Sequence, residues 1–144
     1  MSPLLEKILS ENKLENFAKT AVKNYIYNFD NYKLDLAANE VLSLAINTNL
    51  YLNDNQPWLL IKDKDNLPLV KEIIYNVLEC TRIIGLLLIP LLPELSTKIN
   101  EQLGSIYREE IPWKKQLSWG LLESNSSLPK PTPIINKLEY EQHL

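Results

Sequence analysis

The fold of this chain depends most on the segment Asn49-Leu50-Tyr51-Leu52-Asn53-Asp54-Asn55-Gln56-Pro57-Trp58. A helix with apolar periodicity runs into this segment and should end in its cluster of turn-forming residues. Pro57 cannot continue a helix and fixes its own φ angle. Trp58 follows directly, so its ring is held on a stiff corner. A tryptophan placed in this way either fills the core or offers its flat face to a planar ligand such as a nucleobase.

Apolar spacing predicts helices on both sides of this corner. The expected helices cover residues 2–10, 12–28, 32–52, 68–89 and 93–103. The helix over 68–89 is expected to be the longest and the most central, because its apolar face is wide. A short helical or irregular piece is expected over 57–61, and a solvated loop over 62–66. Pro90 and Pro93 should end the long helix, and Gly104 has the position that follows a helix end.

These helices predict an all-α fold, an antiparallel helical bundle over residues 1–104. Residues 105–144 are expected to form a second, non-helical region. Pro129, Pro131 and Pro133 force an extended path there. Such a proline-rich tail cannot build its own core, so we expect it to pack on the bundle or on a neighbouring domain.

The overall composition is that of one soluble domain. The chain has 144 residues, of which 45% are hydrophobic and 23% charged. Only 3 glycines are present, which argues against hairpin-rich folds and phosphate-binding glycine loops. The net charge is −3 and the pI is about 5.2, whereas a sequence-blind nucleic-acid binder should be basic. Any contact with nucleic acid is therefore expected to be local and shape-dependent.

Catalytic and metal-binding residue sets are missing from the sequence. Cys80 is the single cysteine and His143 the single histidine, so a disulfide within the chain or a four-ligand zinc site cannot form from these residue types. No nucleophile–base set is apparent. The apolar stretch 83–92 is about half the length that a bilayer requires. We expect a non-catalytic helical module in a reducing, cytoplasmic compartment, without a membrane span.

The ordered motifs resemble one known family. Asn49-x-Tyr51-Leu52-x₄-Pro57-Trp58 resembles the N-x-Y-I/V-x₄-P-W signature of the anticodon-binding domain of methionyl-tRNA synthetases. The resemblance extends through residues 27–34 and the helix Leu78-x₃-Arg82-Ile83 with its following prolines. Its C-terminal landmarks are Gln102-Leu103-Gly104, Trp119-Gly120 and Pro131-x-Pro133-Ile134-Ile135. Together these motifs cover roughly residues 10 to 139 in family-like order.

The resemblance implies an anticodon-binding bundle of the class I synthetase type, which reads the CAU anticodon of methionine and initiator tRNA. Trp58 would stack against an anticodon base, Pro57 would brace it, and Asn49 would lie in the same site. Stacking on a splayed base is worth about 1–3 kcal/mol. No catalytic residue and no metal ligand is expected.

Two departures from the family pattern concern the rest of the enzyme. The HIGH-like and KMSKS-like motifs are absent, so ATP and methionine would bind a class I catalytic domain supplied in cis or in trans, and this chain itself would hold no cofactor. The family's further anticodon-reading Asn and Arg residues lie upstream and have no match in residues 1–12. The expected identity is therefore one part of a longer or split synthetase.

Alternative interpretations stay open for each of these residues. Trp58 could be a core tryptophan, and Asn49 could satisfy carbonyls at a helix end. Arg82 is expected to be an ion-pair partner of Glu79 or Glu40 rather than an RNA contact. The rival function is a stand-alone helical scaffold, which the acidic pI favours. An autonomous enzyme is disfavoured by the composition.

Overall fold

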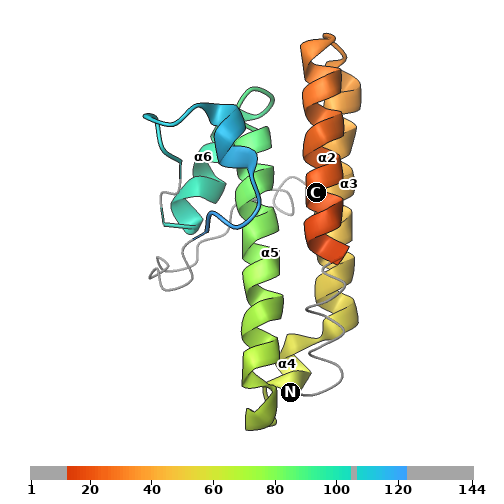
Figure 1. The fold of residues 1–144 in the computed structure, drawn as a ribbon, viewed down its shortest axis with the longest axis vertical. Coiled ribbons are helices and arrows are strands. Elements are labelled where there is room, and N and C mark those ends of the chain that lie inside the picture. Colours follow the sequence, from red (N-terminus) through yellow and green to blue (C-terminus); the bar gives the residue numbers. More distant parts are fainter. Residues whose placement is uncertain (1–12, 105–106, 123–144) are drawn as a thin grey trace, which may run out of the picture.

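The computed structural model describes residues 13–104 and 107–122, and within these ranges it contains helices and no strand (Figure 1). Its elements are α2 (Lys13–Asp30), α3 (Leu34–Asn55), α4 (Pro57–Leu60), η1 (Lys64–Asn66), α5 (Leu67–Leu87), α6 (Pro93–Gln102) and η2 (Trp113–Leu117). The predicted all-α bundle is confirmed. The helix predicted over 2–10 and the proline-rich segment 128–135 lie outside the described residues.

The three long helices lie antiparallel to their neighbours in sequence, as Figure 1 shows. α2 and α3 form a hairpin, and the chain then turns through α4 and η1 into α5. α5 contacts α2, α3, α4, α6 and η2, so it is the central helix of the bundle, as predicted. The short helix α6 lies beside the C-terminal half of α5, at the end of the bundle opposite α4.

Two helices extend further than the sequence predicts. α2 continues two residues further, to Asp30, because Phe29 stacks on the buried Tyr25 with ring centroids 5.7 Å apart. The chain then reverses at Tyr32, which has a φ of 61°. α3 continues to Asn55 and has 22 residues against 21 for α5. The prediction that the helix near 68–89 is the longest was therefore wrong.

The prolines and the glycine act at the helix ends as predicted. α5 ends at Leu87, because Pro90 disfavours helical geometry in the residue before it. α6 begins at Pro93. Gly104 follows α6 with a φ of 88°, a conformation that glycine adopts without strain.

The core contains small residues where helices approach closely. The buried alanines of α2 and α3 are Ala18, Ala21 and Ala37. Tyr25 spans the core, and its hydroxyl donates to the Leu87 carbonyl oxygen at 2.7 Å. Where α6 meets α5, a Cβ atom on Gly85 would lie 2.9 Å from Cγ2 of Ile99. The backbone of α5 can approach α6 so closely only because residue 85 has no side chain.

A buried ion pair attaches the segment 116–122 to α5. The Glu79 carboxylate accepts from Arg82 at 2.6 Å and from the backbone N–H groups of Gly120, Leu121 and Leu122 at 2.8 to 3.1 Å. Arg82 also donates to the carbonyl oxygens of residues 116 and 118. The predicted Arg82–Glu79 pair is confirmed. The boundary predicted at residue 104 remains a prediction.

Candidate functional site

The corner between α3 and α4 is made by one residue in an unusual conformation. Gln56 has φ 45° and ψ 60°, the left-handed region that non-glycine residues rarely occupy. Its N–H donates to the Leu52 carbonyl oxygen at 3.1 Å, which caps α3. Its own carbonyl oxygen accepts from the N–H groups of Leu59 and Leu60 at 3.0 and 3.2 Å, which begins α4. Gln56 therefore joins the two helices without a flexible linker.

Pro57 and Trp58 occupy the first turn of α4. Pro57 is buried and takes the first helical position, where no N–H group is needed. Trp58 is 50% exposed. A ring exposed to this degree is not enclosed in the core, so it has surface available for a ligand. Its role in binding a base stays a prediction.

Asn49 lies on α3, at the same end of the bundle as the corner, and is exposed. The carbonyl-satisfying role that the alternative interpretation gave to Asn49 is performed near this helix end by Asn55, whose Nδ2 donates to the Tyr51 carbonyl oxygen at 2.8 Å. The assignment of Asn49 to the anticodon site is a prediction that no contact in the structure tests.

Hydrogen bonds hold the corner from both sides. On the α3 side, Asn76 Nδ2 donates to the hydroxyl oxygen of Tyr51 at 3.0 Å. On the α4 side, Asn66 Nδ2 donates to the Leu60 carbonyl oxygen at 3.0 Å. Burial raises the pKa of Tyr51, and the hydrogen bond from Asn76 opposes that rise. The corner is thus a rigid support for the Trp58 ring.

Sequence reasoning placed Tyr51 near the corner but missed Asn76. A signal was present: Asn76 lies three residues after Ile73 and four before Cys80, both buried, so a polar residue occupies the apolar face of α5. A buried polar side chain is more informative than an exposed apolar one.

The surface around Trp58 combines apolar side chains with charges of both signs. Leu59 and Ile61 are exposed beside it in sequence. The following loop alternates lysine and aspartate from Lys62 to Asp65, all of them exposed. This end of the bundle therefore offers an aromatic face with apolar neighbours rather than a continuous basic patch.

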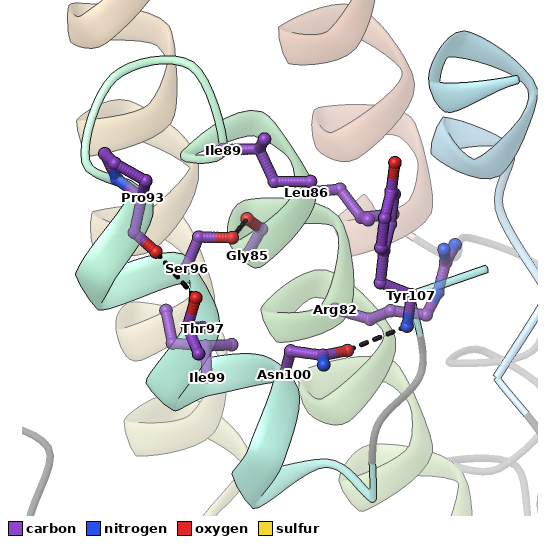
Figure 2. Close-up of a pocket in the computed structure, with 10 residues that line it drawn as sticks. All are labelled: Arg82, Gly85, Leu86, Ile89, Pro93, Ser96, Thr97, Ile99, Asn100 and Tyr107. Atoms are coloured by element: carbon purple, nitrogen blue, oxygen red, sulfur yellow. Dashed lines mark hydrogen bonds between the residues drawn. The ribbon is translucent and has the colours of Figure 1, made fainter. Parts of the chain in front are cut away.

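A cavity of about 200 Å³ lies between α5, α6 and Tyr107, towards the other end of α5 (Figure 2). Polar groups on its walls bind one another: Ser96 Oγ donates to the Gly85 carbonyl oxygen at 2.6 Å, and Asn100 Oδ1 accepts from the Tyr107 N–H at 2.7 Å. In the ranges 13–104 and 107–122 we find no cluster of three His, Cys, Asp or Glu side chains that could hold a metal ion. None of the described helices has the length and apolarity needed to cross a membrane.

The fold is that of an all-α helical domain with an exposed tryptophan at the corner between α3 and α4. Comparison with known families agrees: the profile described as "Anticodon binding domain of methionyl tRNA ligase" matches residues 6–144. The chain belongs to this family of anticodon-binding domains.

The chain is similar to one part of several bacterial methionine–tRNA ligases. The enzyme of Synechocystis sp. is 36% identical over 113 residues, which is 72% of this chain and 21% of that protein. Methionine–tRNA ligase 1 of Bacillus anthracis is 27% identical over 131 residues, 91% of this chain and 20% of that protein. The Nostoc sp. enzyme is 28% identical, over 96% of this chain and 27% of that protein. The chain therefore spans only about a fifth to a quarter of the length of these relatives.

Proposed function

We propose that this chain is the anticodon-recognition module of a methionine–tRNA ligase and that an anticodon base stacks on Trp58. The observation that carries the proposal is the half-exposed indole on a corner that Gln56 and Pro57 make rigid. A rigid ring loses little conformational freedom when a base stacks on it, so more of the stacking energy is available for affinity.

The proposed ligand is the anticodon loop of methionine and initiator tRNA. Single-stranded loops present unstacked bases that aromatic side chains can stack on and polar side chains can read at their edges. Asn49 is the proposed polar contact, because an exposed amide can both donate and accept a hydrogen bond. Stacking contributes about 1–3 kcal/mol per base.

Aminoacylation in translation would require a class I catalytic domain that binds ATP and methionine, in cis or in trans. The greater length of the bacterial relatives supports this requirement. The proposed cellular location is the cytoplasm, where translation takes place.

The first prediction concerns Trp58→Ala. We expect the variant to bind a hairpin RNA with a CAU loop about 1–3 kcal/mol more weakly, because the stacking surface is removed. Helicity measured by circular dichroism should change little, since Trp58 is 50% exposed and is not a core residue. Fluorescence anisotropy with the labelled hairpin gives the affinity.

The matched control is Leu59→Ala, which truncates the exposed neighbouring side chain and leaves the indole in place. It should bind the hairpin nearly as tightly as the unchanged chain. A second hairpin with a substituted anticodon tests specificity. Equal binding of both hairpins, or the absence of binding, would contradict the proposal and favour the scaffold function.

A further inference from the structure

We propose that Asn76 is a positioning residue for Trp58, acting through Tyr51. The inference rests on the proposed function, because it assigns to a buried amide the task of aiming the base-stacking ring. Asn76 lies on α5 and Trp58 on α4, so the connection runs between elements.

The first observation is that Asn76 lowers the stability of the fold at the position it occupies. It is 1% exposed, and its Oδ1 atom has no hydrogen-bond partner among residues 13–104 and 107–122. A buried polar atom without a partner lowers stability, whereas an apolar side chain of similar shape would avoid this cost. Departures of this kind from good core design are expected where a residue serves function.

The second observation is the hydrogen bond that the Asn76 side chain makes within the described part of the chain. Its Nδ2 donates to the Tyr51 hydroxyl oxygen at 3.0 Å, which links α5 to the last two turns of α3. Burial of apolar surface has no preferred direction, so it does not fix how α3 is rotated against α5. A hydrogen bond has a preferred distance and angle, and it can fix that rotation.

The third observation is that Tyr51 is held both at its side-chain hydroxyl and at its backbone carbonyl. Its hydroxyl is held by α5, while its carbonyl oxygen accepts from Asn55 Nδ2 at 2.8 Å in the final turn of α3. Gln56 and the buried Pro57 follow immediately and leave the backbone few alternatives before Trp58. A rotation of α3 at Tyr51 would therefore be transmitted to the indole ring.

The test uses the full chain with Tyr51→Phe and Asn76→Leu combined, which replaces the hydrogen-bonded pair by an apolar contact. We expect a thermal midpoint equal to or above that of the unchanged chain, because the unpartnered oxygen is removed. Affinity for the CAU hairpin should fall about three- to ten-fold. Fluorine NMR of fluorotryptophan-labelled protein should show a shifted or broadened Trp58 resonance without RNA, assigned with Trp58→Phe.

The matched control is Tyr75→Phe. This variant also removes a tyrosine hydroxyl on α5. The Tyr75 hydroxyl donates to the Leu122 carbonyl oxygen at 3.1 Å. The variant should leave the Trp58 resonance and RNA affinity unchanged.

Four outcomes decide between the inference and the proposed function. An unchanged Trp58 resonance in the double variant overturns the inference, and so does unchanged affinity when Trp58→Ala itself weakens binding. A loss of affinity that only follows a loss of folded protein overturns it as well, because the role would then be structural. If Trp58→Ala itself leaves binding unchanged, the proposed function fails, while the resonance still reports whether Asn76 positions the ring.

Discussion

Cys80 and Trp58 show how the same bundle makes one side chain inaccessible and leaves another available. Cys80 is 0% exposed in the core beneath α3. Burial raises the pKa of its thiol from 9.0 to about 12, although a hydrogen bond with Thr48 acts in the opposite direction. Trp58, by contrast, has half of its surface open. Burial therefore decides which of these two side chains is available to react or to bind.

The Cys80 thiol should be unreactive in the folded chain. A thiolate is the reacting species, and neither solvent nor reagent reaches this group without opening of the bundle. Labelling with a thiol reagent near pH 8 should therefore be far slower than for a free cysteine and should accelerate in denaturant. Because the chain has 1 cysteine, the signal comes from a single site.

The sign of the pH effect follows from the raised pKa. The unfolded thiol ionises near pH 9 and the folded thiol only near 12, so the folded state holds its proton more firmly. The contribution of Cys80 to stability is complete below pH 9 and is lost as the pH rises towards 12. Rapid stoichiometric labelling of the native chain would contradict the burial of this group.

Individual residues were predictable from sequence where their covalent structure imposes the geometry. Pro57 had to interrupt the preceding helix because its ring fixes φ, which places Trp58 on the corner, whereas the piece after Pro57 was predicted only as helical or irregular. The structural role of Asn76 was not predicted, because an analysis of apolar spacing passes over a single polar residue on an apolar helix face. Only the folded structure shows that the Asn76 side chain donates to the hydroxyl oxygen of Tyr51.

Helices were predictable because the apolar spacing of each element matches one buried face. The ends of α2 and α3 were less predictable, because contacts made by side chains determine where these two helices end. Phe29 continues α2 by stacking on Tyr25, and Asn55 continues α3 by satisfying the Tyr51 carbonyl oxygen. Asparagine in a sequence signals a turn, but here its side chain supports the last helical turn.

At the scale of elements, the Glu79 carboxylate attaches residues 120–122 to α5. Glu79→Gln should lower the free energy of unfolding by about 3–5 kcal/mol, because Arg82 would keep its buried charge without a charged partner. The substitution conserves shape, so the loss reports the charge. Urea unfolding followed by circular dichroism measures it.

Glu72→Gln is the control for this prediction. Glu72 also lies on α5 but is only partly buried, so the change should stay within about 0.5 kcal/mol. If the two variants unfold at the same urea concentration, the buried pair does not hold the segment as described.

The whole molecule carries a net charge of −3, which limits how it can bind RNA. Near the corner the exposed lysines Lys62, Lys64 and Lys71 are interspersed with Asp63 and Asp65. We expect this surface to make few phosphate contacts, because the acidic residues offset part of the attraction of the lysines. If the chain binds an anticodon loop as proposed, the affinity should come mainly from stacking and from contacts with base edges.

This balance predicts a weak dependence of RNA affinity on salt. Each phosphate neutralised on a single strand contributes a slope of about −0.7 in log affinity against log salt. With one or two such contacts, the slope for the CAU hairpin should be no steeper than about −1.5.

Trp58→Ala should lower the affinity without changing the slope, because stacking releases no counterions. Lys71→Ala should make the slope shallower while leaving anticodon preference intact. A slope steeper than about −3 would mean that phosphates, and not the indole, provide most of the binding energy.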